Sequence, residues 1–202
     1  MKQTPADDLA KTALPPAPGA DRYRSLDFAD TTATLPAGHS YDLLAVPASA
    51  MRWLAVHDLT TPDIQLYDVC TRRMRALRVH VRALFTARVE GTAPPAESLG
   101  AVNDALIAVP TAPLLAWDGT QGPRRVQAHP TDQAVGHALA TLAADAADLL
   151  TGADGGLLAV CGSAPCDRFL LRTHGRRHWC STRCGDRARA ARAYARRSGN
   201  AT

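Results

Sequence analysis

The clearest pattern along the chain is a stripe of apolar residues between positions 67 and 84. Six residues recur at alternating intervals of three and four: Tyr67, Cys70, Met74, Leu77, Val81 and Leu84. This spacing places them on one face of an α-helix. Thr61 is a candidate N-cap, Pro62 suits the first helical position and Gly91 marks the end. Because Cys70 lies on this stripe, we interpret it as an inert core thiol.

A shorter helix is predicted ahead of this one, beginning at Pro47 and stopping near Asp58. Its expected inward residues are Met51, Trp53 and Leu54. Further upstream, residues 23–33 alternate Leu26 and Phe28 with polar residues. That pattern predicts either a short extended segment or a buried lead-in to the core.

Two more helices are predicted downstream, one from Pro95 to Val109 and one starting at Thr131 or Asp132. The expected inward residues are Leu99, Val102, Leu106 and Ile107 in the first, and Val135, Leu139, Leu142, Ala146 and Leu149 in the second. Between these helices, the apolar runs 113–117 and 124–128 flank the sequence DGTQGP, which predicts a β-hairpin. The sequence TGADGG at 151–156 ends the last helix and predicts a flexible joint.

These elements predict a fold that is mainly α with one small β-hairpin, followed by a small C-terminal unit. A length of 202 residues suits one medium domain with an appendage. We expect a disordered arm over residues 1–21, a helical domain over residues 22–152 and a finger over residues 157–198. The arm is rich in proline and lacks the apolar block of a signal peptide, and no apolar run approaches the roughly 20 residues of a membrane span. We therefore expect a cytoplasmic protein that does not enter a membrane.

Four of the five cysteines lie within 24 residues of one another. They follow the pattern Cys161-x4-Cys166-x13-Cys180-x3-Cys184. In a reducing compartment two close cysteine pairs indicate a metal rather than disulfides, and four thiolates satisfy tetrahedral Zn²⁺ without leaving an open position. The pattern therefore predicts one structural zinc ion per chain in a knuckle, with the second pair near a helix N-terminus.

Other interpretations of the cluster stay open. His174 or His178 could replace one cysteine as a ligand, the thiols could be reduced without a metal, and an iron–sulfur cluster is a further alternative. Phe169 and Trp179 are expected to form the core of the finger. The other histidines are scattered, and the chain has no P-loop, G-x-G-x-x-G or G-x-S-x-G motif. We therefore do not expect an enzyme.

Positive charge is concentrated around the cysteines. The net charge of the whole chain is +4, but residues 161–202 carry ten arginines against Asp167 and Asp186. A helix is predicted from Asp186 to Arg197, with Arg189, Arg192 and Arg196 on one side and Ala188, Ala191, Tyr194 and Ala195 packed against the knuckle on the other. Arginine suits phosphates and guanine edges, although a chain with only two lysines uses arginine everywhere. The predicted nucleic-acid-binding residues are Arg172, Arg176, Arg177, Arg187, Arg189, Arg192, Arg196 and Arg197.

The stretch from Cys161 to Arg187, above all RRHWCSTRCGDR at 176–187, resembles the CGNR zinc finger. The upstream part resembles the ABATE domain that accompanies this finger in bacterial proteins described as stress-related transcription regulators. That domain typically opens with Leu-x-Phe-x-Asn-Thr, which here reads Leu26, Phe28, Asp30 and Thr31. The pieces Asp42-Leu43-Leu44 and Trp53-Leu54 match as well. The resemblance implies that the finger binds double-stranded DNA and that the helical domain senses an effector or forms a homodimer.

The chain departs from the family pattern at Asp30 and Asp186, where the family has asparagine. An aspartate at position 186 would repel a phosphate, but it could instead cap the following helix. We interpret the chain as a DNA-binding transcription regulator. The alternative is a protein-interaction module whose zinc site is purely structural, and salt-sensitive binding to duplex DNA distinguishes the two.

Overall fold

The computed structural model describes residues 15–34, 40–60, 64–109, 114–120, 122–126, 134–175 and 177–199. Helices predominate, which confirms the predicted fold class. The helices are α2 (Arg24–Ala29), α3 (Pro47–Val56), α4 (Asp68–Glu90), α5 (Ala96–Ile107), α6 (Ala134–Thr151) and α7 (Thr182–Gly199), with a 3₁₀ turn, η3, at Ala153–Leu157. Where one hairpin was predicted, the described residues form three antiparallel strand pairs.

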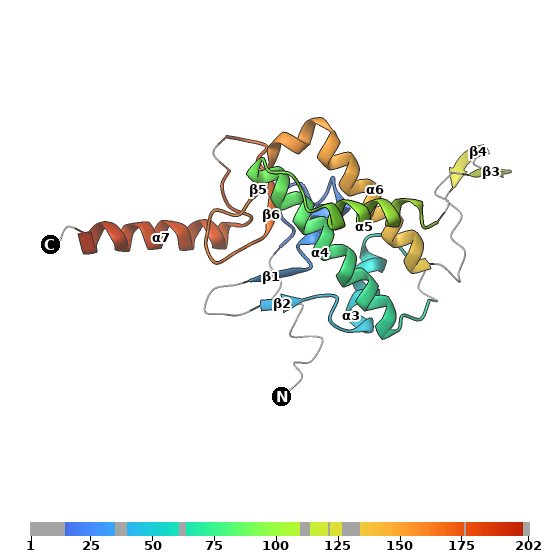
Figure 1. Ribbon diagram of the computed structural model, residues 1–202, viewed down its shortest axis with the longest axis horizontal. Helices are drawn as coiled ribbons and strands as arrows, with labels where there is room; N and C mark the ends of the chain where they lie inside the picture. The colour runs from blue at the N-terminus through green and yellow to red at the C-terminus, as the bar shows by residue number, and fades with distance from the viewer. Residues whose placement is uncertain are drawn as a thin grey trace.

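The strand pairs are short and separate from one another. They are β1 (Thr32–Thr34) with β2 (Ser40–Asp42), β3 (Leu114–Asp118) with β4 (Gly122–Val126), and β5 (Leu158–Val160) with β6 (Phe169–Leu171). The β3–β4 pair is the hairpin that the sequence predicted. It stands away from the helices at one end of the molecule, and α7 projects from the other end (Figure 1).

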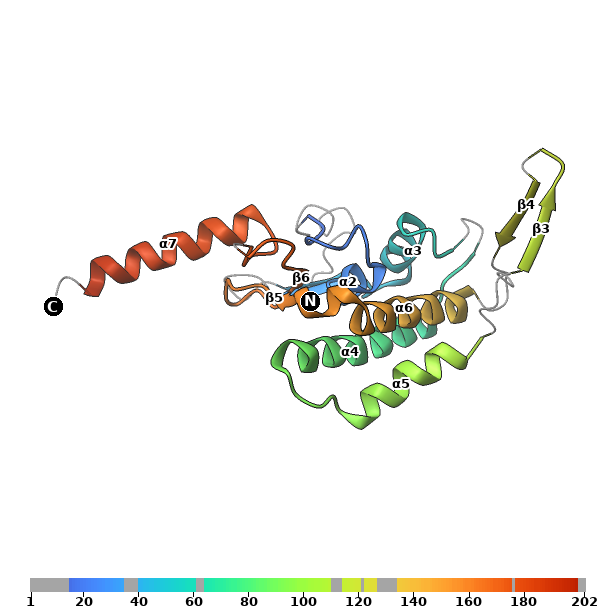
Figure 2. The ribbon, with the colours of Figure 1, turned by 90° about the horizontal axis from the view of Figure 1, so that it is seen from above.

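The central helices form a layer that carries most of the core. In Figure 2, α4 and α6 lie side by side with α5 along their outer edge, and α2, β5 and β6 lie on the other face. Met74, Leu77, Val81 and Leu84 of α4 are buried, as the stripe predicted. All five apolar residues predicted to face inward from α6 are buried too, and so are Trp53 and Leu54 of α3.

Several predictions about individual elements are wrong. Residues 24–29 form a short helix rather than an extended segment, and the burial of Leu26 and Phe28 in the main core confirms the other alternative, a buried lead-in. The long helix begins at Asp68, so Tyr67 precedes it and is exposed, and Cys70 is half-buried against the core. Of the four residues predicted to face inward from α5, Val102 is buried and Leu106 is half-buried, because this helix lies along the edge of the layer. Leu99 and Ile107 of α5 are exposed. The predicted starts at Thr61, Pro62, Thr131 and Asp132 lie outside the described residues.

Of the arm expected to be disordered over residues 1–21, the described part, from residue 15 onward, packs against β6. Pro18 accepts a hydrogen bond from the backbone N–H of Leu171 at 2.8 Å, and Ala17 and Ala20 are buried. Gly19 has a φ of +97°, and a Cβ there would lie 2.5 Å from Leu171. Only glycine therefore allows this segment to approach β6 so closely.

Strand β6 belongs to two cores at once. Phe169 and Leu171 face the main helical core, where Phe169 packs edge-on against Phe85 with ring centroids 5.5 Å apart. Leu170, which points to the opposite face, packs among the four cysteines. Phe169 thus corrects the expectation that it serves the finger alone. The joint predicted at 151–156 is also not loose, because η3 is ordered and Asp154 accepts a hydrogen bond from the hydroxyl of Tyr23 at 2.9 Å.

Candidate metal centre

The four cysteines predicted as ligands converge on one point. Their sulfur atoms all lie within 4.8 Å of one another, and all four side chains are buried. Cys161 follows β5 and Cys166 precedes β6, while Cys180 and Cys184 flank the start of α7. This placement confirms the expectation that the second pair lies at a helix N-terminus. His174 and His178, the alternative ligands, are exposed and do not belong to the group.

Local hydrogen bonds explain how the chain forms the two knuckles. In the first, the backbone N–H of Cys161 donates to the carbonyl of Arg168 at 2.8 Å, and Cys166 donates to the carbonyl of Ser163 at 3.0 Å. In the second, the hydroxyl of Ser181 accepts from the backbone N–H of Cys184 at 3.2 Å. Ser181 is therefore the cap of α7, and Asp186 lies inside the helix rather than capping it.

The sulfur spacing fits zinc. Zinc–thiolate bonds of about 2.3 Å in a tetrahedron place neighbouring sulfurs about 3.8 Å apart. Cys180 Sγ lies 3.7 Å from Cys166 Sγ and 3.6 Å from Cys184 Sγ. Four thiolates complete the coordination, so a zinc ion in this cluster has no open position for a substrate. The cluster is consistent with one structural Zn²⁺ ion.

Donors around Cys161 favour the thiolate form that a metal requires. Hydrogen bonds from Cys166 and Cys180 lower the pKa of Cys161 to about 2, and the same contacts raise the pKa of Cys166 to about 12 and also raise that of Cys180. The backbone N–H of Cys180 donates to the Cys161 sulfur at 3.4 Å. Two arginines add positive charge. The Arg168 guanidinium lies 3.9 Å from Cys180 Sγ, and that of Arg187 lies 3.6 Å from Cys184 Sγ. Such contacts hold and tune the ligands of a metal site.

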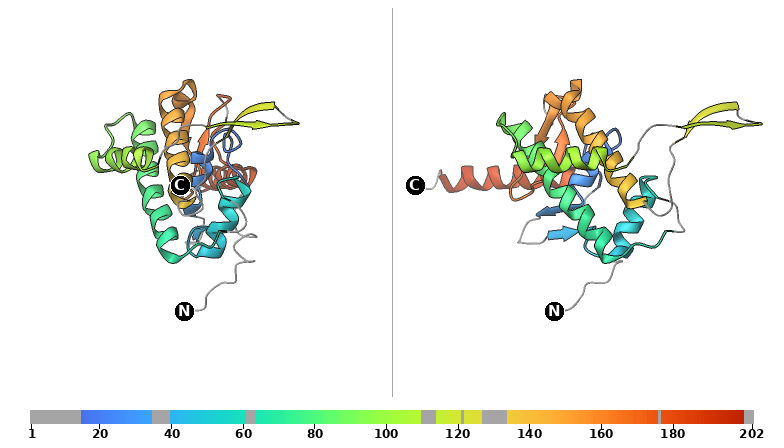
Figure 3. Two further views of the ribbon diagram at one scale, coloured as in Figure 1. Left: turned by 90° about the vertical axis from the view of Figure 1, so that its right-hand side faces the viewer. Right: turned by 45° about the vertical axis from the view of Figure 1, so that its right-hand side comes forward.

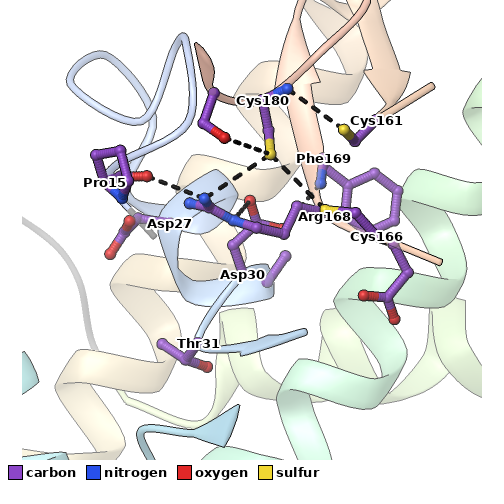
Figure 4. Close-up of polar contacts among 12 residues, drawn as sticks. Pro15, Asp27, Asp30, Thr31, Cys161, Cys166, Arg168, Phe169 and Cys180 are labelled. Carbon is purple, nitrogen blue, oxygen red and sulfur yellow. Dashed lines mark hydrogen bonds and ion pairs between the residues drawn. The ribbon is translucent and has the colours of Figure 1, made fainter. Parts of the chain in front are cut away.

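Arg168 also joins the metal cluster to the helical domain, as Figure 4 shows. Its side chain is only 2% exposed, and its Nε donates to Asp30 Oδ2 at 3.1 Å. A second donor, Nη1, reaches the carbonyl of Pro15 at 2.9 Å. The other oxygen of Asp30 accepts from the backbone N–H of Phe169 at 2.9 Å. Burial raises the pKa of Asp30 to about 7, against the opposing effect of Arg168.

A second polar cluster, which the sequence did not reveal, lies close to Asp30 in the helical domain. Arg78 makes a two-pronged contact with Asp42, at 2.6 and 2.8 Å, and donates to the hydroxyl of Thr31 at 3.0 Å. The guanidinium of Arg82 donates to the carbonyl of Ala29 at 2.8 Å. These arginines directly follow Leu77 and Val81, so they lie beside the apolar stripe of α4, and its pattern gave no sign of them. Together they fix the turn that carries Asp30.

The predicted nucleic-acid-binding arginines separate into groups. Arg172, Arg177, Arg189, Arg192, Arg196 and Arg197 are exposed. Arg187 is only partly exposed, because its Nη2 donates to the carbonyl of Ser163 at 2.7 Å and contacts Cys184 Sγ. It therefore stabilises the knuckle. Arg176 lies outside the described residues. Arg189 also pairs with Asp186 at 2.5 Å.

Helix α7 does not pack on the knuckle along its length, which corrects the expectation that its alanine-rich face is covered. Of the face predicted to be covered, Ala188 is buried, whereas Ala191, Tyr194 and Ala195 are exposed. Three views show the helix projecting into solvent (Figures 1, 2 and 3). Alanine offers little apolar area, so this face gains little by packing. The helix therefore presents most of its circumference to the outside.

Trp179 connects the base of α7 to a groove of about 360 Å³. The guanidinium groups of Arg189 and Arg192 each lie 5.5 Å from its ring centroid, a cation–π distance. Gly185 allows this approach, since a Cβ there would lie 3.1 Å from the ring. The groove is lined by His174, Arg177, His178, Trp179, Ser181, Thr182, Gly185 and Arg189.

The helical layer followed by a buried four-cysteine knuckle and a basic helix defines a zinc-finger protein with an N-terminal helical domain. Residues 23–153 match the ABATE family, described as "Putative stress-induced transcription regulator", and residues 158–197 match the CGNR zinc finger. The first match spans more than half of the chain, so the chain belongs to the ABATE family. Neither family is an enzyme family. No curated protein matches the chain. In the described part of the chain, no helix is both long and apolar enough to traverse a bilayer.

Proposed function

We propose that the chain is a transcription regulator that binds double-stranded DNA through its finger and α7. The observation that carries the proposal is the exposed basic helix. Helix α7 has 18 residues and stands clear of the helical domain. At 1.5 Å per residue it is about 27 Å long, and the major groove of DNA, about 12 Å wide, admits an α-helix.

The charge on this helix supports a polyanionic partner. Its six arginines face one acidic residue, Asp186, which pairs with Arg189. Arg187 serves the knuckle, so the candidates for contact with phosphates on α7 are its exposed arginines, with Arg177 beside them at the groove. Neutralising phosphates releases counterions, which supplies affinity that depends on salt.

Trp179 gives part of this surface a fixed shape. By holding the guanidinium groups of Arg189 and Arg192 over its ring, it limits the rotamers of two long side chains before DNA arrives. Less side-chain entropy is then lost on binding. Arg196 and Arg197, which lie nearer the free end of α7, have no such support and are expected to act as adaptable charges.

The test is fluorescence anisotropy of a labelled duplex, titrated with zinc-loaded full-length protein at several salt concentrations. Replacing Arg189, Arg192 and Arg196 with alanine should flatten the plot of log affinity against log salt by roughly 2 to 3 units, at about 0.9 per phosphate. Alanine preserves the helix. The matched control replaces Arg24, Arg52 and Arg72, three exposed arginines of the helical domain, and should leave the slope unchanged.

If both triple variants weaken binding equally, or if the intact protein has no salt-dependent affinity for DNA, the finger is instead a protein-docking module.

Since a DNA partner places a regulator with the chromosome, we infer that the protein acts in the cytoplasm. A small-molecule effector for the helical domain stays a prediction.

A further inference from the structure

The β3–β4 hairpin projects from the helices as an arm (Figures 2 and 3), and it exposes bulky apolar side chains. Leu115 is 75% exposed and Trp117 76%, and they share one face because residues two apart on a strand point the same way. Leu114, on the other face, is exposed as well. The two strands form a sheet of their own. Since an isolated two-stranded hairpin is only marginally stable in water, the arm needs a surface to cover it.

The helical domain carries an open groove of about 350 Å³ between α4, α5 and α6. Half of its lining is small, namely Ala76, Ala101, Ala105, Ala108 and Gly136, and the rest is Leu77, Leu139, Arg73, His80 and Asp104. Beside it, Ile107 is 81% exposed and extends the apolar surface along α5. The volume lies at the lower end of the range of binding pockets, roughly 300 to 1,000 Å³. A lining of small side chains leaves room for bulky ones from elsewhere.

The arm and the groove are complementary in size, and each offers one member of an ion pair. The arm offers large side chains on a narrow ribbon, and the groove offers space between helices. Arg125 stands directly opposite Leu115 in the hairpin, and Arg124 stands opposite Ala116. Asp104 lies at the groove on α5. Directly opposite residues of a strand pair share a face, so Arg125 lies on the face of Leu115 and Trp117, and Arg124 lies on the other. Docking that face into the groove brings Arg125 to Asp104 on α5, with Arg73 and His80 on the α4 wall.

We propose that the arm of one copy docks into the α4–α5–α6 groove of a second copy of this chain. Within a single chain the arm stands away from the helices with its leucines and tryptophan exposed, and the groove is open. Every copy carries both surfaces, so an exchange of arms forms two identical contacts and closes a two-fold dimer, the commonest symmetry of soluble oligomers. This inference does not depend on DNA binding by the finger.

The test is light scattering coupled to gel filtration, on zinc-loaded full-length protein over a wide range of concentration. The wild-type chain should be a dimer. Trp117→Glu in the arm and Ala105→Arg in the groove should each produce monomers. Loss of an aromatic anchor at an interface weakens it by about 30-fold, and two arms per dimer give roughly 1,000-fold. The control is Val79→Glu, an equally drastic change at an exposed position of α4 that does not line the groove, and it should leave the dimer intact.

Mixing the two monomeric variants gives the sharpest outcome. A mixed dimer retains one intact arm in one intact groove, so mixing should restore a weakened dimer, and circular dichroism should show that both variants remain helical. A monomeric wild-type chain overturns the proposal. If Trp117 of that monomer is also shielded from a fluorescence quencher, the arm folds onto the groove of its own chain instead. A dimer that persists in the arm variant overturns it as well, since the arm lies outside the core and its variant should fold.

Discussion

The buried contact between Arg168 and Asp30 predicts that the finger and the helical domain fold together. Replacing Arg168 with methionine keeps the volume of its apolar stem but removes the cation. Asp30, whose side chain is 1% exposed, then loses its charge partner, while Pro15 and Cys180 lose a donor. Breaking a buried ion pair from one side costs about 3 to 5 kcal/mol. Since domains of this size have a total stability of about 5 to 15 kcal/mol, the loss should be large.

Urea unfolding followed by helical circular dichroism at about pH 8.5, above the pKa of about 7 of Asp30, with zinc in excess, measures that cost. Competition with a chelator should also show zinc affinity reduced about 10- to 100-fold, because Arg168 contacts a ligand sulfur. The matched control is Arg189→Met, which removes the exposed pair with Asp186 and should cost less than about 1 kcal/mol. Adding Asp30→Leu to Arg168→Met should recover most of the stability, since the orphaned charge is then gone. A loss below about 1 kcal/mol for Arg168→Met, or a double variant no more stable than the single one, would refute the coupling.

Three other predictions follow from the same contacts. Elemental analysis should find one zinc ion per chain. Removing the zinc with a chelator should lower the melting temperature of the whole helical circular dichroism signal, since β6 belongs to both cores. An unchanged melting temperature would contradict the shared core. Phe169 packs against Phe85 in the main core, so Phe169→Ala should lower the free energy of unfolding in urea by about 3 to 5 kcal/mol. A loss below about 1 kcal/mol would place Phe169 outside the main core. Burial raises the pKa of Asp30 from 3.8 to about 7. Between these two pH values the folded chain therefore holds a proton that the unfolded chain has released. The resulting contribution to the free energy of unfolding is full below pH 3.8 and is lost as the pH rises through about 7. Asp30→Asn cannot titrate, so its stability relative to wild type should increase between about pH 4 and 7 and then level off; a difference independent of pH would refute this.

The parts of the fold that were predictable have a strong period in the sequence. Met74, Leu77, Val81 and Leu84 follow one face of a helix, and the structure buries all four. Two pairs of closely spaced cysteines likewise predict a metal knuckle from local geometry alone. In both cases the signal and the structure it specifies lie within the same short segment.

The wrong predictions concern contacts between distant segments. Leu99 and Ile107 have the right spacing for an inward face, but spacing does not show how much of α5 the layer covers. Short runs such as 158–160 and 169–171 carry no sign that β5 and β6 join the main core. Arg168 resembles the other basic residues of its loop, and only its position between Cys166 and the apolar run FLL distinguishes it.

Cross-linking can map the surface of the protein that touches DNA. Zinc-loaded full-length protein would be cross-linked to duplex DNA that it binds, and the linked peptides would be identified by mass spectrometry. We expect cross-links on the groove around Trp179 and along α7, with links absent from α4 and α5. Cross-links confined to the helical domain, or none at low salt where electrostatic binding is strongest, would contradict this expectation.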